Sequence, residues 1–395
     1  MPGPGSYWIG EEEKQEVLDV LESGHLSRYG QLDDPKYKQK VLTFEKEFAS
    51  YVDVGHACAN TGGTASIFIA LRVLGFQPGD EIIVPTYGYV ATYSAPIFAG
   101  LVPVLTEIDE SLTMDPEDIK RRITPKTRAI MPVQMLGLPS DMDSIMDIAN
   151  DHGLPVIEDA CQAAGASYKG RKVGSFGKMS AFSLNVFKTI TTGDGGILVT
   201  DDEELRDLAF GVQDHGYRPD DGWLKIGENS ILGMNFRMNE MTGAVALAQL
   251  RKLDNITATL RRKKKRLKDA IDGIPGTKFR RVDDPEGECG TLCTVIFDRA
   301  EKAASVARTL GTTTVDVSAW HVYANMDHIN RHLASIGRPH SKGAYPVTDD
   351  ILSRSINLSV GVVDPGLGAA FGININSSDD EIDAAAEKFR QACSA

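Results

Sequence analysis

The residues AIMPVQMLGLPSDMDSIMDIANDHGLPVIED, at positions 129–159, decide the fold class of this chain. Short apolar runs at 129–133 and 155–157 predict strands, and the segment 142–152 between them predicts a helix. Strands that alternate with helices imply right-handed crossovers between parallel neighbours. The sequence therefore predicts an α/β fold with a largely parallel sheet covered by helices on both faces. Further strand candidates with the same character lie at 81–84, 103–105, 179–182 and 196–199.

The alternation of strands and helices weakens after about residue 235, where a helical segment at 238–270 forms one long helix or two joined ones and ends near Gly273. We therefore predict a large domain with an N-terminal segment over residues 1–250 and a small C-terminal domain over 251–395, entered through the long helix. The C-terminal part has the pattern of a small α+β unit, with a strand and two helices at 292–297, 301–310 and 379–392.

The composition is that of a soluble globular protein, with 42% hydrophobic and 25% charged residues among 395. The net charge of −13 would repel a phosphate backbone, so we expect no binding to nucleic acid. No apolar stretch approaches the roughly 18 residues of a membrane span. The first residues have neither the basic flank nor the apolar core of a secretory signal, and a cytoplasmic protein without membrane contact is expected.

The basic run at 261–266 lies in the long helical segment, where a solvated helix face is a simpler interpretation than an anion-binding patch. The cysteines are few, scattered and odd in number, which predicts reduced thiols. No His or Cys set with ligand spacing accompanies them, so we expect no metal site. The cysteines are Cys58, Cys161, Cys289, Cys293 and Cys393.

Two clusters suggest a site for an anionic, ring-containing ligand. The sequence TGGT at 61–64 enters a helix, whose free N–H groups favour a phosphate, although glycines there also serve simply as turn residues. The sequence VIED at 156–159 places two carboxylates at the end of a buried strand, the edge where α/β sheets bind ligands. A carboxylate there could hold the proton of a pyridine nitrogen, or merely cap the next helix.

A lysine follows the strand at 179–182. Lys188 lies in a loop among small residues that allow a planar ligand to approach, and desolvation can lower the pKa of such an amine enough for it to form a Schiff base. An ordinary surface lysine is the alternative.

The clusters and their order resemble the DegT/DnrJ/EryC1/StrS family of pyridoxal-phosphate aminotransferases over nearly the whole chain. The resemblance implies the aspartate aminotransferase-like fold, fold type I, in a homodimer whose active sites are shared between subunits. It rests on TGGT at 61–64, PTYGYVAT at 85–92, VIEDACQAAGA at 156–166, FSLNVFKTITTGDGG at 182–196 and GMNFRM at 233–238.

Carried over by position, the resemblance implies that Lys188 forms the Schiff base with pyridoxal phosphate and that Asp159 bonds the pyridine nitrogen. Gln162 matches a group near the phenolic oxygen of the cofactor, and Tyr89 matches the ring that stacks on the pyridine. Asn235 matches an asparagine that reaches the phosphate from the neighbouring subunit. The matched phosphate-cradle positions are Gly63, Thr64 and Ser183.

Three positions depart from the family pattern. Gln134 stands where many members have His, Gly88 precedes the stacking aromatic where a larger residue is common, and Gly62 supplies no hydroxyl to the phosphate loop. Dehydratase members resemble this pattern but have His at the aldimine position, so Lys188 favours amino transfer.

The resemblance implies a ping-pong transfer of an amino group from an amino acid, with glutamate expected, to a keto-sugar for amino-sugar biosynthesis, with Lys188 moving the proton. A keto-cyclitol, an acid sugar such as an octulosonate, and a non-catalytic member that binds the cofactor or a sugar remain alternatives. Trp320 and His321 are candidate substrate residues, although each could equally have a packing role. Arg237 could pair with an anionic group of the substrate or with an interface carboxylate.

Overall fold

The computed structural model describes residues 3–220, 223–225 and 230–395, and its described part is built around one central sheet. A four-stranded portion, β1-β9-β8-β5, is continued by β4-β2-β3 through parallel bridges that pair Ile130 with Val156 and Val133 with Asp159. Only β9 runs against its neighbours, so the sheet is mainly parallel, as predicted. The strands are β1 (His56–Asn60), β2 (Glu81–Pro85), β3 (Val102–Thr106), β4 (Thr127–Ile130), β5 (Ile157–Asp159), β8 (Met179–Ser183) and β9 (Gly196–Thr200).

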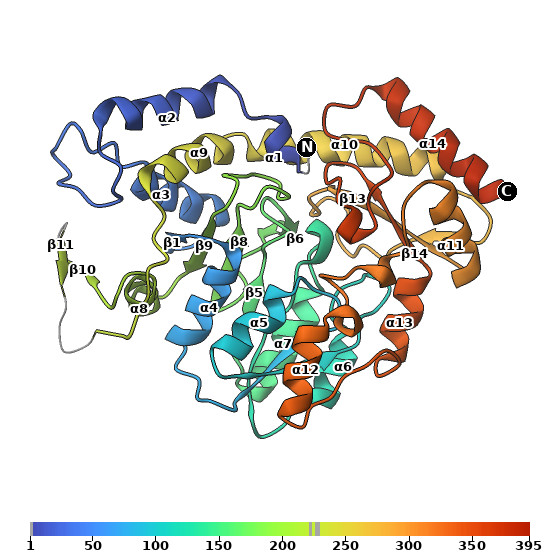
Figure 1. Ribbon diagram of the computed structural model, residues 1–395, viewed down its shortest axis with the longest axis horizontal. Helices are drawn as coiled ribbons and strands as arrows, with labels where there is room; N and C mark the ends of the chain where they lie inside the picture. Colours follow the sequence, from blue (N-terminus) through green and yellow to red (C-terminus); the bar gives the residue numbers. More distant parts are fainter. Residues whose placement is uncertain (1–2, 221–222, 226–229) are drawn as a thin grey trace.

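Helices cover both faces of this sheet (Figure 1). Alternate residues of β2 show it, because Ile82 and Val84 join one apolar cluster while Ile83 joins another. The first cluster is covered by α4 (Gly63–Val73), α5 (Ala91–Phe98) and α8 (Glu203–Gln213), and the second by α6 (Pro116–Arg122) and α7 (Met142–His152). Both helical layers exclude water from the strands, as an α/β fold requires.

Helix α7 has the bounds that the sequence predicts. The Asp141 side chain accepts a hydrogen bond from the Ser144 amide at 3.2 Å and fixes the first turn. Gly153 ends the helix with a φ of 63°, a left-handed conformation that glycine adopts without strain. By contrast, the sequence shows no strand pattern just before TGGT, yet β1 lies there and pairs antiparallel with β9.

The helical segment at 238–270 is two joined helices, α9 (Glu240–Leu250) and α10 (Leu253–Ile271). With α2 (Glu11–Ser23) and α3 (Lys40–Val52), α9 forms a layer beside the strands, whereas α10 continues toward the C-terminal elements and packs against α14 (Asp379–Ser394) (Figure 1). Residue 251 therefore lies at the junction of the two helices. The division into domains at that residue stays a prediction.

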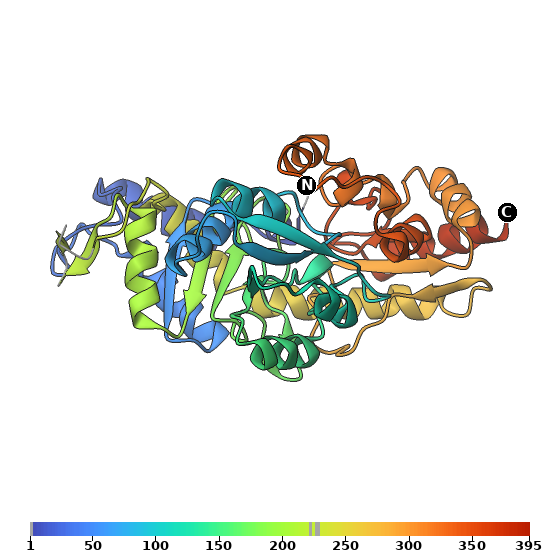
Figure 2. The same cartoon turned by 90° about the horizontal axis from the view of Figure 1, so that it is seen from below.

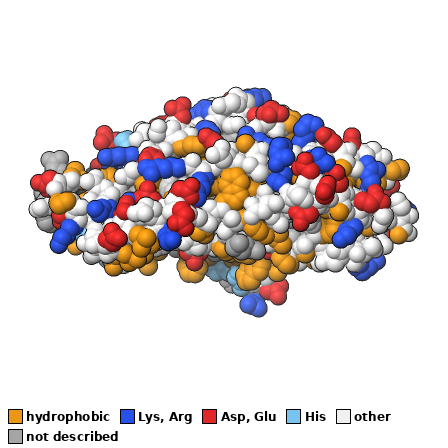
Figure 3. All heavy atoms as spheres, turned by 90° about the horizontal axis from the view of Figure 1, so that it is seen from above, with side chains coloured by type: hydrophobic (Ala, Val, Ile, Leu, Met, Phe, Trp, Pro, Cys, Tyr) orange, Lys and Arg blue, Asp and Glu red, His pale blue; other side chains and the backbone are white. Residues whose placement is uncertain are grey.

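The basic run is not simply a solvated face, which corrects the sequence interpretation. Lys263 and Lys264 are buried, and Lys264 pairs with the buried carboxylate of Glu288. Arg266, on the exposed side, pairs with Asp383 at 2.6 Å. Figure 3 shows the face above α10, where basic and acidic side chains are interspersed. The run therefore serves packing between elements, because each of these charges has an acidic or carbonyl partner.

The C-terminal elements occupy one end of an elongated molecule (Figure 2). An antiparallel sheet, β12-β13-β14, forms their centre, and the long helices α10 and α14 pack beside it. The bounds are β12 (Thr277–Phe279), β13 (Leu292–Phe297), β14 (Ser355–Ser359), α11 (Ala300–Thr309), α12 (Asp327–Ser335) and α13 (Pro346–Ser353). The described residues also form the 3-10 turns η1 (Met135–Gly137), η2 (Val315–Val317), η3 (Tyr323–Asn325) and η4 (Pro365–Leu367).

The remaining elements are short. Within the described residues, β6 (Ser167–Tyr168) pairs antiparallel with β7 (Arg171–Lys172), and β10 (Arg218–Asp220) pairs antiparallel with β11 (Trp223–Lys225). Helix α1 (Pro4–Tyr7) opens the described chain. Among the helices of the described ranges, none is both long and apolar enough to cross a bilayer. The five cysteines are all free thiols.

Candidate functional site

The carboxyl ends of β1, β2, β5 and β8 meet at one edge of the central sheet, beside a cavity of about 530 Å³. Open α/β sheets bind their ligands at this edge, because the loops there diverge and leave a crevice. Nine of the eleven site residues predicted from the sequence line the cavity. They are Gly63, Thr64, Tyr89, Asp159, Gln162, Ser183, Lys188, Trp320 and His321.

The two carboxylates of VIED point to different places, as alternation along a strand requires. Asp159 lines the cavity at 3% exposure, where its carboxylate accepts hydrogen bonds from the Thr92 hydroxyl at 2.8 Å and the Cys161 amide at 3.3 Å. Glu158 is buried behind the sheet and accepts from backbone amides, including that of Phe176 at 2.8 Å. Of these two carboxylates, Asp159 is therefore the one that can meet a cationic ligand group.

Lys188 lies in a tight loop between β8 and β9. The loop is held by hydrogen bonds from the Leu184 amide to Gly195 at 2.8 Å and from the Val186 amide to Gly193 at 2.9 Å. Burial lowers the pKa of the Lys188 amine, and the Cys161 thiol and the Asp159 carboxylate partly offset this effect. A larger fraction of neutral amine results, which is the form that attacks a carbonyl carbon.

Helix α1 supports the lysine loop from behind. The Ser6 hydroxyl donates to the Val186 carbonyl at 3.1 Å. A Cβ on Gly5 would lie 2.9 Å from the Cα of Ile190, so the two backbones touch and only glycine fits without movement. The loop is therefore clamped between α1 and the sheet.

The N-terminus of α4 faces the cavity through Gly63 and Thr64. Its first turn carries no side-chain cap among the described contacts, so the amides there can receive an anion. A Cβ on Gly63 would lie 2.8 Å from the Cβ of Ser183, which brings the Ser183 hydroxyl next to the same turn. These donors suit a phosphate group.

Tyr89 and His321 are held by a short antiparallel ribbon between residues 86–90 and 320–323. The Gly88 amide donates to the His321 carbonyl at 2.9 Å, and the Val90 amide donates to the Trp320 carbonyl at 2.8 Å. The Tyr89 ring, 42% exposed, lies 5.4 Å from the His321 ring and 5.9 Å from the Lys188 Nζ, measured between or to ring centroids. An aromatic face is thus presented to the cavity beside the amine.

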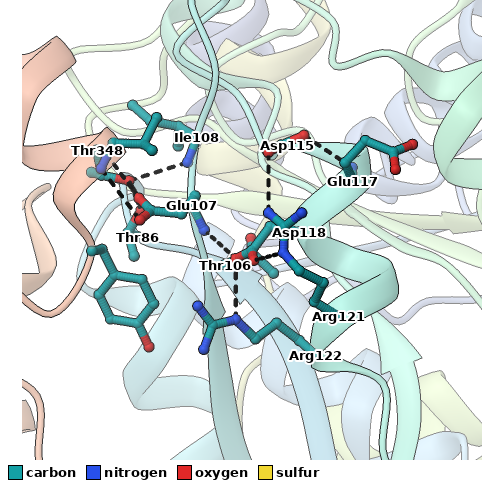
Figure 4. Close-up of polar contacts among 12 residues, drawn as sticks. Thr86, Thr106, Glu107, Ile108, Asp115, Glu117, Asp118, Arg121, Arg122 and Thr348 are labelled. Atoms are coloured by element: carbon teal, nitrogen blue, oxygen red, sulfur yellow. Dashed lines mark hydrogen bonds and ion pairs between the residues drawn. The ribbon is translucent and has the colours of Figure 1, made fainter.

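A buried polar network fixes the base of this ribbon (Figure 4). The Glu107 carboxylate accepts from the Thr348 amide and hydroxyl, and Thr348 Oγ1 lies 2.8 Å from Thr86 Oγ1. The Glu107 amide donates to Asp118 at 2.8 Å, which holds the carboxylate in place. Glu107, which follows β3, is therefore bonded to Thr348 at the start of α13, and Thr348 contacts Thr86, where the ribbon begins.

Asn235 and Arg237 do not line the cavity of their own chain. Asn235 is exposed, and Arg237 pairs with the buried carboxylate of Asp214. Gln134, one of the departures from the family pattern, is fully buried and donates to Glu158 at 3.0 Å. Gln134 therefore orders the sheet behind Asp159 and does not contact the cavity.

Sequence reasoning missed Asp364, Asp194 and the cavity-lining role of Cys161. Asp364 follows β14 in the segment Asp364-Pro365-Gly366, where the pattern indicates only a turn. Burial raises the pKa of the Asp364 carboxyl, while the Gly366 amide and the Lys188 charge oppose that shift. The nearness of Asp364 to Lys188 depends on the packing of β14 and could not be read from spacing.

The sequence matches the profile of the DegT/DnrJ/EryC1/StrS aminotransferase family over residues 8–363. The spore coat polysaccharide biosynthesis protein SpsC of Bacillus subtilis (strain 168) is 38% identical over 76% of each chain. The GDP-perosamine synthase of Vibrio cholerae is 30% identical over 88% of this chain and 90% of its own.

Solved structures agree with these matches. The 3-amino-5-hydroxybenzoic acid synthase has a TM-score of 0.81 and 28% identity over 98% of this chain and 97% of its own. Streptomyces venezuelae DesV, solved with a ketimine intermediate, has a TM-score of 0.79 and 29% identity, with 98% of this chain and 95% of its own covered. The predicted fold type I architecture is confirmed.

Proposed function

Because the chain belongs to the DegT/DnrJ/EryC1/StrS aminotransferase family, we propose that it transfers an amino group from L-glutamate to a keto-sugar in a ping-pong reaction that uses pyridoxal phosphate. The observation that carries this proposal is the meeting of Lys188, Asp159 and the N-terminus of α4 in one cavity. An amine, a carboxylate and an anion-binding turn match the aldehyde, the ring nitrogen and the phosphate of that cofactor.

The cavity residues fit the cofactor by their chemistry. When bound, pyridoxal phosphate supplies an electron sink for the pair released from the Cα–H bond of the donor. Asp159 would hold a proton on the ring nitrogen, since its carboxylate is kept in place by Thr92 and Cys161. Tyr89 would cover one face of the ring, and Gln162 would lie near its phenolic oxygen.

Lys188 would act first as the attachment point and then as the base. With cofactor and donor bound, the Lys188 amine would take the α-proton of the donor and return it to C4′ of the cofactor. The lowered pKa of Lys188 suits this exchange near neutral pH, because a base works best when its pKa lies close to the working pH.

The acceptor and the assembly rest on similarity to relatives. GDP-perosamine synthase and dTDP-3-amino-3,4,6-trideoxy-alpha-D-glucose transaminase, the latter 32% identical over 80% of this chain, are named for amino sugars. A homodimer is proposed because Asn235 is exposed and would have to reach a phosphate in a neighbouring subunit. Trp320 and His321 are proposed to face the acceptor.

Absorbance spectroscopy tests the function. The purified holoenzyme should show a visible cofactor band that L-glutamate converts to the spectrum of the pyridoxamine form. That form should then be reoxidised by one member of a panel of nucleotide keto-sugars, keto-cyclitols and keto-acid sugars. A bound cofactor whose spectrum no amino acid changes would overturn amino transfer and favour a non-catalytic binding protein.

A further inference from the structure

Four side chains on the C-terminal wall of the cavity are organised around Gly366. The Gly366 amide donates to Asp364 Oδ1 at 2.8 Å. The Gly366 carbonyl accepts a hydrogen bond from the Ser318 hydroxyl, and Ser318 Oγ lies 3.1 Å from His321 Nδ1. A Cβ on Gly366 would lie 3.7 Å from Trp320 Cδ1 and 3.0 Å from Asp364 Oδ1, so the indole and the carboxylate flank the same point.

These contacts fix the tautomer of His321. A serine hydroxyl has a single proton, and a carbonyl can only accept, so Ser318 gives its proton to Gly366. His321 Nδ1 must therefore be the donor in its contact with Ser318, which leaves Nε2 as an acceptor in the neutral ring. Burial lowers the pKa of His321 to about 3, and the Lys188 charge adds to this effect, so the ring stays neutral.

Each of the two side chains keeps one acceptor without a partner in the described contacts. Asp364 Oδ1 is used by Gly366, whereas Oδ2 has no partner among the described residues. His321 is 5% exposed and lines the cavity, and the side-chain hydrogen bond of its ring within the described residues, with Ser318, uses Nδ1. Both residues line the cavity, so a ligand that brings hydrogen-bond donors can meet these acceptors there.

We propose that Asp364 Oδ2 and His321 Nε2 form an acceptor-only subsite that binds two hydroxyl groups of the amino acceptor beside its carbonyl carbon. This inference rests on the proposed function. It adds that the part of the amino acceptor at this wall is an uncharged carbon chain with several hydroxyl groups. Trp320, 53% exposed, offers an apolar face to the C–H groups of that chain. A carboxylate at the same place would be repelled by Asp364.

Asp364→Asn reverses the chemistry of the subsite without changing its shape. The amide oxygen must face the Gly366 N–H, so the NH₂ group replaces the free oxygen and presents donors. His321→Phe keeps a ring and removes both nitrogens. Asp316→Asn is the matched control, since Asp316 lies in the same segment, pairs with Lys342 at 3.5 Å and does not line the cavity.

The test uses the pyridoxamine form of the holoenzyme and three simple carbonyl probes. D-glyceraldehyde and propanal have equal chain lengths and differ in two hydroxyls, and 2-oxoglutarate is an anion. For each probe, the rate at which the enzyme returns to its pyridoxal spectrum is measured. This rate is divided by the rate of the same probe with free pyridoxamine phosphate, which corrects for the intrinsic reactivity of the probe. The wild type should react faster with glyceraldehyde than with propanal. In both cavity variants the ratio of these two corrected rates should fall about tenfold.

The anionic probe separates this effect from general damage. Asp364→Asn removes a negative charge, so its rate with 2-oxoglutarate should stay equal or rise while its rate with glyceraldehyde falls. Asp316→Asn should keep the wild-type preference. Failure of 2-oxoglutarate to convert the wild type would overturn the proposed function itself. Conversion by 2-oxoglutarate without a glyceraldehyde preference, or with a preference that both variants retain, would overturn the acceptor subsite alone.

Discussion

Glu107 and Thr348, 241 positions apart in the chain, are joined by two hydrogen bonds, from the Thr348 amide at 2.8 Å and from its hydroxyl at 2.6 Å. Both residues are buried, so neither bond can be replaced by water. The pair connects the loop after β3 to the first turn of α13 and lies beside Thr86. Its geometry therefore links the packing of the C-terminal elements to the residues that present Tyr89.

Replacing Thr348 with valine should destabilise the protein by about 1–3 kcal/mol, because the Glu107 carboxylate and the Ile108 amide each lose a partner in a buried place. Thr348→Ser retains the hydroxyl and is the control. The free energy of unfolding in urea measures both. Equal stabilities for the valine and serine variants would show that the hydroxyl has no such role.

Stability should fall at mildly acidic pH because of His321. Its pKa is lowered to about 3 in the folded protein, so below about pH 6.5 the unfolded chain binds a proton that the folded chain refuses. Between pH 7.5 and pH 5 this single residue should remove about 2 kcal/mol of stability. Urea unfolding of the wild type and of His321→Gln at both pH values measures it, and equal losses in the two proteins would contradict it.

Gly5→Ala should disturb the Lys188 loop, since the added Cβ would lie 2.6 Å from Gln249 Oε1 and 2.9 Å from the Ile190 Cα. We expect a loss of about 1–3 kcal/mol in stability and a shifted visible spectrum of the holoenzyme. Gly10→Ala serves as control, because its Cβ would approach only the flexible Glu12 side chain closely, at 3.3 Å. A normal spectrum and stability for Gly5→Ala would rule out the clamp.

Thr92→Val should weaken the binding of pyridoxal phosphate about tenfold, because the hydroxyl that holds the Asp159 carboxylate is lost. Thr92→Ser should bind nearly as the wild type does. Equilibrium dialysis of the cofactor gives the two dissociation constants directly. If valine and serine give the same constant, Thr92 does not position Asp159.

Elements with local signals could be predicted from the sequence. The bounds of α7 are readable because Asp141 and Gly153 mark its ends. Asp159 is readable as a candidate because two carboxylates follow directly on the apolar run at 155–157. Strand β1 was missed since His56-Ala57-Cys58-Ala59-Asn60 contains no β-branched or large aromatic residue, and its pairing with β9 alone makes it a strand.

The C-terminal wall of the site was predictable only in part. Trp320 and His321 entered as candidates through a resemblance, whereas Asp364 has a turn signal and nothing that points to a cavity. Its place depends on distant parts of the chain, because the Ser318 hydroxyl donates to the carbonyl of Gly366, 48 positions away, and the Lys188 charge acts on the Asp364 carboxyl. The burial of Lys263 and Lys264 was missed for the same reason, because their partners Ser377 and Glu288 are distant in the chain.

The ribbon between residues 86–90 and 320–323 has a consequence for attempts to redesign the enzyme. Tyr89 and His321 are presented from opposite strands of one hydrogen-bonded unit. Replacing the loop at 320–323 to accommodate another sugar would therefore also move the Tyr89 ring. A change of substrate specificity should need both segments, 86–90 and 320–323, to be exchanged together from one related enzyme.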